Sequence, residues 1–424
     1  MTRSLTEGDP FKLIISFSIP LLISNLFQQL YNMIDTIVVG QCVGINAMAA
    51  VGASGSLTFL MTGFIMGLCP GLAIPISQEY GAQNYNSMRR YVTNSLYVGM
   101  MISAIMTVIS CAGARLFLEW MSTPADIIDD AWNYCIYLFA AIPITFLYNY
   151  LSSIMRALGD SKTPLYFLIL SSILNVPLNL FFVIVLHTGT AGVSIATVIA
   201  QLVSGVLCYV YMKKRFPILQ LSRSDWEWST PHVKKLLYIG IPMALQNSIT
   251  AIGSTVLQAA TNTFGSAIVA AVTAASKVVQ LFFQAINTVG LTMATYCGQN
   301  LGAKQLDRIK SGIRIAYAIG LIYSVFIAIV SYFWGNAVAG LFLTADADPS
   351  IMEHVESFLF VTSLGYPFLT SLMILRNSIQ GLGYSFLAMF SGVMEMLARV
   401  ILAFFLVEPL GYMAICLTFT LPGY

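Results

Sequence analysis

The sequence has few charged residues: Asp, Glu, Lys and Arg make up 9% of its 424 residues, and only three histidines are present. About a quarter of the residues in a soluble globular domain are charged, so this composition excludes an ordinary soluble protein. The 58% of hydrophobic residues and a mean hydropathy of +0.80 instead predict an all-α polytopic membrane protein. The net charge of +2 gives no reason to expect nucleic acid as a partner.

Motifs for catalysis and metal binding are also missing. The seven cysteines form no CxxC or Cys/His spacing that is typical of a metal site. The sequence contains no HExxH, GxSxG or Ser/His/Asp set, and His187, His232 and His354 fall near predicted helix ends or in loops. These absences argue against an enzyme, and no organic cofactor is expected.

Long apolar runs separated by short polar turns predict transmembrane helices. A twelfth run begins near Gly411, but the chain ends at Tyr424, which is too short to cross a bilayer about 30 Å thick. We therefore expect a truncated last helix. The first run lacks a signal-peptide cleavage site, so we expect it to remain as a helix. The eleven complete spans are expected at 13–39, 47–76, 92–114, 132–155, 164–186, 190–212, 235–260, 267–296, 313–336, 355–379 and 385–407.

Lys and Arg gather in alternate connections between these spans. Arg89, Arg90 and the basic run at 213–215 fall on one side, whereas Asp129 and Asp130 fall on the other. By the positive-inside rule, the N-terminus is predicted to be cytoplasmic, with the protein in the inner (plasma) membrane of the cell. The loop 213–234 is then a cytoplasmic connection between spans six and seven.

The two halves of the chain resemble each other. Matching motifs recur at separations of 222, 221 and 224 residues, around Pro20 and Pro242, Gly81 and Gly302, and Gly159 and Gly383. Both halves begin on the same side of the membrane, so they are parallel repeats, an arrangement known in secondary transporters. We predict two six-helix lobes, 1–212 and 235–424, with a cleft between them and the twelfth helix incomplete.

A polar stripe on span one contains the carboxylate of Asp35. Burying an ionised carboxylate in lipid costs roughly 3 kcal/mol or more, so such a residue needs a function or a partner. The stripe recurs on span seven, but Leu257 replaces the carboxylate there, and this asymmetry predicts an ion site in the N-terminal half. The alternative is a protonated Asp35 that only hydrogen-bonds neighbouring helices. The stripe predicted to line the substrate cavity comprises Asn25, Gln28 and Asn32 on span one and Asn247, Thr250 and Ser254 on span seven.

Partners for Asp35 are predicted from depth in the membrane. Asn175 and Asn179 lie four residues apart on span five around Pro177, and Thr197 lies on span six at a similar outer depth. One carboxylate, two amides and a hydroxyl suit a hard cation such as Na⁺, or a proton held in a hydrogen-bond network. The alternative is that the amides only join helices.

Other charged residues within the predicted spans also need a role. Glu395 and Arg399 are four residues apart on span eleven and are predicted to form a structural pair. Lys277, near the middle of span eight, has three alternatives: it reaches the interface, pairs with Glu395, or lines the substrate cavity.

The chain resembles the multidrug and toxic compound extrusion (MATE) transporters, most closely their DinF-like branch, in motifs that begin at Tyr31, Gln78, Arg156 and Gly192. The resemblance implies a twelve-helix, two-lobed antiporter that exports amphipathic, often cationic compounds against inward flow of Na⁺ or H⁺.

The resemblance also implies a cation site at Asp35, Asn175, Asn179 and Thr197. Asn179 departs from the family pattern because a second carboxylate is expected at its position. Losing that charge weakens Na⁺ binding and favours H⁺.

Two other membrane functions were weighed. A lipid-linked oligosaccharide flippase of the same superfamily needs several basic residues in its cavity. Apart from Lys235 and Arg314 at the starts of their spans, only Lys277, Arg376 and Arg399 lie within the spans. A passive channel is disfavoured because selectivity rings repeat a residue around the pore. The expected partners are a small organic substrate and the lipid bilayer, and the chain is expected to be a monomer.

Overall fold

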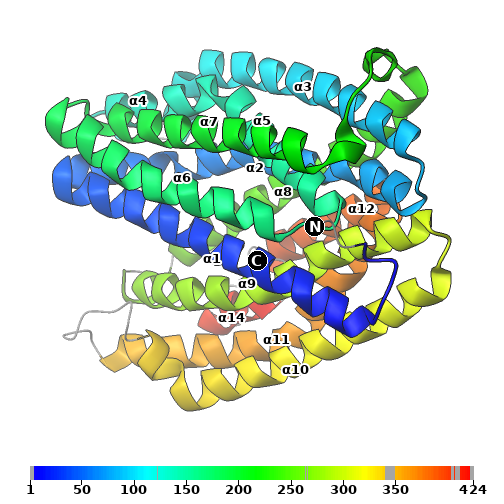
Figure 1. Cartoon of the computed structure of the whole chain (residues 1–424). Helices are drawn as coiled ribbons and strands as arrows, with labels where there is room; N and C mark the ends of the chain where they lie inside the picture. The colour runs from blue at the N-terminus through cyan, green and yellow to red at the C-terminus, as the bar shows by residue number, and fades with distance from the viewer. Residues whose placement is uncertain are drawn as a thin grey trace. The chain divides into compact units, whose positions relative to one another are not determined.

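A computed structural model describes residues 4–121, 123–262, 264, 266–339, 349–402, 405 and 411–420 (Figure 1). The chain divides into two compact units. Unit 1 contains Met1–Glu7, Ile19–Ser248 and Gly298–Gln305, and unit 2 contains Gly8–Ser18, Ile249–Cys297 and Leu306–Tyr424. These units are defined by contacts and change over within helices, whereas the predicted lobes are divided by sequence. The lobe limits therefore stay a prediction.

The described residues are almost entirely helical and contain no strand. Nine of the described helices are long and apolar enough to cross a membrane, and a bent pair makes a tenth candidate. The first half contains α1 (Pro10–Cys42), α2 (Ile45–Gly81), α3 (Tyr85–Trp120), α4 (Ile128–Ala140), α5 (Ile142–Ala157), α6 (Lys162–Leu180), the π-helical η1 (Phe181–Val185) and α7 (Gly189–Arg215). The second half contains η2 (Pro217–Leu219), η3 (Arg223–Trp226), α8 (Thr230–Asn262), α9 (Ser266–Gly302), α10 (Leu306–Ala339), α11 (Pro349–Gly381), α12 (Ser385–Ile401) and α14 (Tyr412–Thr420).

The internal repeat is visible in the helices themselves. α1 and α8 each have 33 residues, and α2 and α9 each have 37. Within unit 1, the ends of α2 and α9 cross at their matching glycines. A Cβ atom on Gly81 would lie 1.9 Å from the Gln299 carbonyl oxygen, and one on Gly302 would lie 1.8 Å from that of Gln78. Only glycine allows backbones to approach this closely.

Two predicted spans differ from the structure at prolines. Span four, predicted as one helix, is divided into α4 and α5 by a bend of 52°. Pro143 stands in the first turn of α5, where its ring and missing N–H stop a helix from continuing through it. Span five contains Pro177 and then changes from α-helix to the π-helical η1.

The last two predicted spans are described only in part. α12 ends at Ile401, and most residues from there to 407 lie outside the described residues. α14 covers Tyr412–Thr420, and residues 421–424 also lie outside them.

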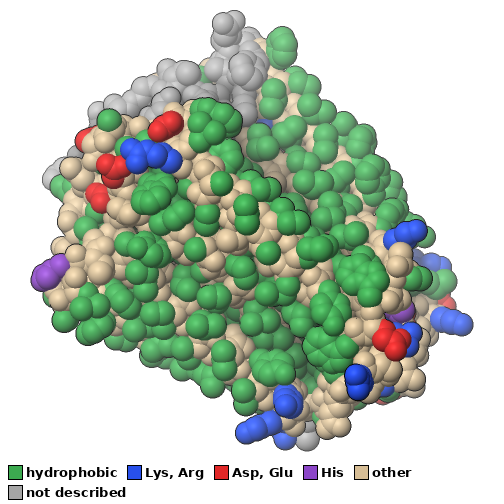
Figure 2. Space-filling view, turned by 90° about the horizontal axis from the view of Figure 1, so that it is seen from above, with side chains coloured by type: hydrophobic (Ala, Val, Ile, Leu, Met, Phe, Trp, Pro, Cys, Tyr) green, Lys and Arg blue, Asp and Glu red, His purple; other side chains and the backbone are tan. Residues whose placement is uncertain are grey.

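Apolar side chains form both the interior and the surface of the helices. In unit 1, α2, α3, α4, α5 and α7 pack around a buried core that includes Leu68, Phe139 and Phe146. Large side chains such as Val108 and Phe333, each 68% exposed, face outward. Figure 2 shows hydrophobic side chains over most of the visible face, with charged side chains at its margins. A surface of this kind is solvated by lipid rather than by water.

Candidate functional site

The Asp35 carboxylate is buried on α1 and accepts two hydrogen bonds. The Asn179 side-chain amide donates to Oδ1 at 2.6 Å, and the Thr197 hydroxyl donates to Oδ2 at 3.4 Å. Asp35 is only 8% exposed. Hydrogen bonds to a buried carboxylate offset part of the loss of its hydration.

The two amides and the hydroxyl also bond one another. Asn179 donates to the Asn175 side-chain oxygen at 2.9 Å, and Asn175 donates to the Thr197 hydroxyl at 3.2 Å. With Asp35, they close a ring of four residues within unit 1, which we call the Asp35 ring. The structure thus brings together the four residues of the predicted cation site, while their role in ion coupling stays a prediction.

The fold of α6 and α7 holds the amides and the hydroxyl in place. Asn175 and Asn179 share one face of α6 because they lie four residues apart. Pro177 lies between them and offers no backbone N–H, so the helix is disturbed here, and the π-helical η1 follows directly. α6 packs against α7, and Thr190 and Ser194 of α7 donate to backbone carbonyls of α4 at 2.9 and 2.6 Å.

Tyr31 is a neighbour of the ring that the sequence reasoning did not single out. It stands one helical turn before Asp35, and its hydroxyl is buried close to Thr197. The Asn179 side-chain oxygen has no hydrogen-bond partner among the described residues. Spacing of four residues from Asp35 is the signal by which Tyr31 could have been found. The Tyr31 hydroxyl is therefore a further buried polar group beside the ring.

The polar stripe falls into two groups in the structure. Asn25 and Gln28 are half-buried and Asn32 is exposed. Asn247 instead donates to the Gly63 carbonyl of α2 at 3.3 Å, so within unit 1 its amide joins two helices. Thr250 is half-buried, and the side chain of Ser254 lies outside the described residues.

The charged residues of the C-terminal half form a larger cluster than predicted. Glu395 pairs with Arg399 at 3.0 Å, as the spacing predicted, and also with Arg376 of α11 at 2.6 Å. Arg376 further donates to the Ser391 hydroxyl at 3.0 Å. Lys277 is exposed and forms no ion pair with any described residue. The alternative in which Lys277 pairs with Glu395 is therefore wrong for the described structure.

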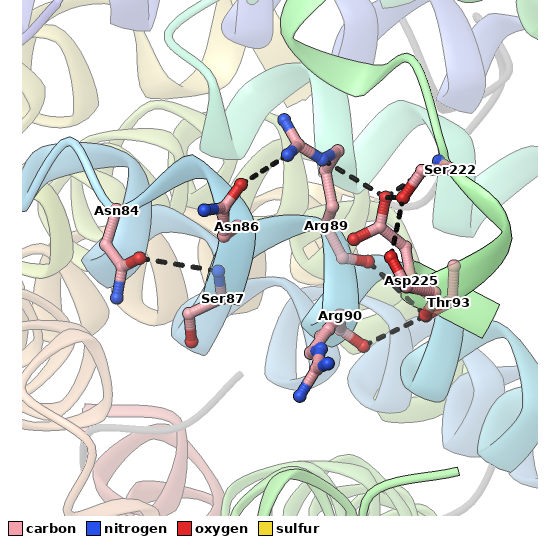
Figure 3. Close-up of polar contacts among 9 residues, drawn as sticks. Asn84, Asn86, Ser87, Arg89, Arg90, Thr93, Ser222 and Asp225 are labelled. Carbon is pink, nitrogen blue, oxygen red and sulfur yellow. Dashed lines mark hydrogen bonds and ion pairs between the residues drawn. The ribbon is translucent and has the colours of Figure 1, made fainter. Parts of the chain in front are cut away.

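A polar cavity of about 410 Å³ lies where the loop between the two halves meets α3. Figure 3 shows Arg89 of α3 between Asn86 and Asp225, with Ser222 on the far side of the Asp225 carboxylate. Arg89 approaches Asp225 at 3.2 Å. The lining groups largely bond one another, which makes this an anchor for the loop within unit 1. The cavity is lined by Asn86, Ser87, Arg89, Arg90, Ser222, Ser224, Asp225 and His232.

Electrostatics favour the charged form of this anchor. Burial raises the pKa of the Asp225 carboxyl, but hydrogen bonds from Ser222 and the Arg89 guanidinium outweigh it and hold the pKa below its ordinary value. Further along the loop, Asn94 of α3 donates to the Glu227 carbonyl at 3.2 Å and accepts from the Ser229 backbone at 2.9 Å. The loop is thus fixed to α3 on both sides of Trp226.

Several known proteins are similar to this chain in sequence or in fold. Two relatives from Bacillus subtilis (strain 168) are the probable multidrug resistance proteins YoeA and YpnP. YoeA is 28% identical over 81% of this chain and 76% of its own length, and YpnP is 26% identical over 89% and 84%. A multidrug resistance MATE family transporter of the MOP superfamily, solved in an outward-facing conformation, has the same fold, with a TM-score of 0.90 at 22% identity over 98% of this chain and 93% of that one.

The family model MatE matches residues 20–181 and 242–405, one segment in each half of the repeat. The matched segments contain Asp35, Asn175 and Asn179 in the first half, and Glu395 and Arg399 in the second. Together they cover most of the chain. The chain therefore belongs to the MatE family, whose members are membrane transporters.

Proposed function

We propose that the chain is a cation-coupled antiporter that exports amphipathic, often cationic organic compounds across the plasma membrane. The observation that carries this proposal is the Asp35 ring, in which a single buried carboxylate is held by neutral groups alone. In this proposal the chain acts as a monomer with a cytoplasmic N-terminus, and it is a transporter and not an enzyme.

The geometry of the ring favours a proton as the coupling ion. The ionised Asp35 carboxylate accepts from Asn179 and Thr197, so its charge is satisfied without a metal ion. A proton on either oxygen adds a donor to the ring and weakens the hydrogen bonds that Asp35 accepts, because a neutral carboxyl is a poorer acceptor than a carboxylate. Protonation therefore changes the contacts by which the charge of Asp35 is linked to the packing of α1 against α6 and α7.

A sodium ion fits these contacts less well. The Asn179 N–H groups occupy Asp35 Oδ1 and the Asn175 side-chain oxygen, which are two of the oxygens that Na⁺ would need. Only one negative charge is present, so the Coulomb attraction for a metal ion is roughly halved relative to a pair of carboxylates.

Antiport requires that ion and substrate stabilise different conformations. In the proposed cycle, one conformation binds substrate with Asp35 ionised. Protonation of Asp35 from outside favours the other, and the proton leaves inside. The polar stripe residues Asn25, Gln28 and Asn32, which lie along the same helix as Asp35, are proposed to contact the substrate.

Efflux from proteoliposomes tests this proposal. The purified chain is reconstituted, and release of the cationic dye ethidium is followed under a pH gradient and, separately, under a Na⁺ gradient. We expect the pH gradient alone to drive release. Release driven by Na⁺ alone would contradict proton coupling, and release that needs neither gradient would contradict antiport.

A lipid-linked oligosaccharide flippase remains the alternative function. Arg376 and Arg399 are both engaged by Glu395, which leaves Lys277 and Arg314 as exposed cations among the described residues of the predicted spans. Lys277 and Arg314, which stands at the start of its span, are a poor match for a pyrophosphate, which is usually held by several converging basic groups. The same proteoliposomes, loaded with a fluorescent lipid-linked pyrophosphate sugar, are expected to show no gain in flipping over protein-free vesicles.

A further inference from the structure

The C-terminal half contains a second buried cluster, formed by Arg376 of α11 with Glu395 and Arg399 of α12. All three residues belong to unit 2. Their side chains are at most 5% exposed, and Glu395 meets the two guanidinium groups at 2.6 and 3.0 Å. Each ion loses its hydration on burial, so the two guanidinium groups depend on the Glu395 carboxylate that they share.

The internal repeat relates this cluster to the Asp35 ring by sequence position. The separation of 224 residues that relates Gly159 to Gly383 also relates Asn175 to Arg399 and Ser171 to Glu395. A guanidinium therefore stands at the position of a ring amide, and a carboxylate stands one helical turn away. The counterpart of Asp35 itself is Leu257, which is buried.

A second replacement on α8 makes room for the guanidinium. The separation of 222 residues that relates Pro20 to Pro242 also relates Tyr31 to Gly253. A Cβ atom on Gly253 would lie 3.3 Å from Arg399 Nη1 and 3.6 Å from its Cδ. Gly253 thus leaves open the space that the Tyr31 side chain fills in the N-terminal half. Two positions on different helices are changed together, and both changes accommodate one cation.

We propose that Arg376, Glu395 and Arg399 form a fixed-charge counterpart of the Asp35 ring. The Arg399 guanidinium stands where the N-terminal half takes an exchangeable cation. Glu395 stays ionised throughout transport, and ion exchange is confined to Asp35. Among the described residues, the charged groups in ion-pair contact with Glu395 are these two guanidinium groups. The proposal rests on the proposed function in assigning ion exchange to Asp35, whereas the state of Glu395 is tested separately.

Infrared titration of the purified full chain in lipid nanodiscs tests it without any transport substrate. Protonated and ionised carboxyl groups absorb at different frequencies, so subtracting the spectrum of a variant isolates one carboxyl. The spectrum of the wild type minus that of Glu395→Gln is expected to show the band of an ionised carboxylate from neutral to mildly acid pH. The spectrum of the wild type minus that of Asp35→Asn is expected to show a carboxyl group that gains a proton as the pH falls.

A double variant shows what the guanidinium groups do. Arg376→Ser with Arg399→Asn installs the residues found at the repeat-related positions Ser152 and Asn175. Glu395 then lacks cationic partners, and we expect a second titrating carboxyl that disappears when Glu395→Gln is added. The matched control is Arg399→Lys, which retains a cation and is expected to titrate like the wild type.

A Glu395 that gains a proton in the wild type at neutral or mildly acid pH would overturn the proposal. So would a folded double variant that gains no second titrating carboxyl. If a variant fails to fold, isotope labelling of glutamate carboxyls in the wild type separates their bands from those of aspartate, and no protonated glutamate is expected at neutral pH. A failure of Asp35 alone to titrate would instead contradict the proposed function and leave the result for Glu395 standing.

Discussion

The two buried clusters satisfy a carboxylate in opposite ways. In the N-terminal half, Asp35 is surrounded by neutral donors, so neutralising it leaves no other charge unmatched. In the C-terminal half, Glu395 lies between two guanidinium groups, so neutralising it leaves two buried cations. A charge that can be removed at low cost is suited to exchange with solution, whereas a charge locked between partners is suited to holding helices together.

The largest effect on transport is expected from Asp35→Asn. The amide keeps the size and much of the hydrogen bonding of the carboxyl but cannot gain or lose a proton. We expect gradient-driven dye efflux to fall to the level of protein-free vesicles, while the free energy of unfolding changes by about 1 kcal/mol or less. The measurement is efflux together with the detergent melting temperature, and normal efflux by a well-folded variant would contradict the role of Asp35.

The largest effect on stability is expected from Glu395→Met, which removes the carboxylate from two buried guanidinium groups. We expect a loss of roughly 3–5 kcal/mol, seen as a clear drop in melting temperature. The matched control replaces Arg376, Glu395 and Arg399 together by Met and is expected to recover most of that loss. Equal melting temperatures for Glu395→Met and the wild type would show that the two guanidinium groups do not need the carboxylate. The C-terminal cluster would then not differ from the Asp35 ring in the cost of neutralising its carboxylate.

A smaller gain of function is expected from Asn179→Asp. The change adds a second carboxylate beside Asp35 and removes the N–H group that occupies its Oδ1. Doubling the negative charge strengthens attraction for a metal cation, so we expect the response of dye efflux to Na⁺ to rise severalfold. Asn175→Asp, on the same face of α6, is the comparison variant. No change in Na⁺ dependence would show that Asn179 lies outside the ion site.

The smallest effect concerns the loop between the halves, which is anchored to the N-terminal half through Asp225. Because the pKa of Asp225 is lowered in the folded protein, the anchor contributes fully above about pH 4, the ordinary range of an Asp. Its contribution is lost as the pH falls through the lower folded pKa. Cleavage of the loop by pepsin is expected to rise only at the acid end of a pH series. In Asp225→Asn it is expected to be elevated throughout, and identical profiles would contradict the anchor.

Much of the fold follows from the sequence because lipid allows few solutions for the backbone. Long apolar runs have to be helices in a membrane, and the repeat shows which helices correspond. The Asp35 ring could be predicted because depth and a four-residue spacing restrict which polar side chains meet. The bend at Pro143 was missed because hydropathy measures length and not direction.

Arg376 was missed as a partner of Glu395 for a different reason. It lies 19 residues away on another helix, and helical spacing identifies only partners on the same helix. Tyr31 was passed over because a tyrosine in an apolar helix is usually a packing residue. Only the burial of its hydroxyl beside Thr197 distinguishes it.

The crossing of α2 and α9 has a consequence for ancestry. Gly81 faces the Gln299 backbone while Gly302 faces that of Gln78, so equivalent residues make the same contact from both sides. A contact of this kind is what a two-fold symmetric homodimer makes. An ancestor of half the length, with a single Gln-x-x-Gly segment, would already have held the chemistry needed to pair with a copy of itself. Fusion of two genes would then have preserved an existing interface, and each half would afterwards have been free to acquire its own buried charges.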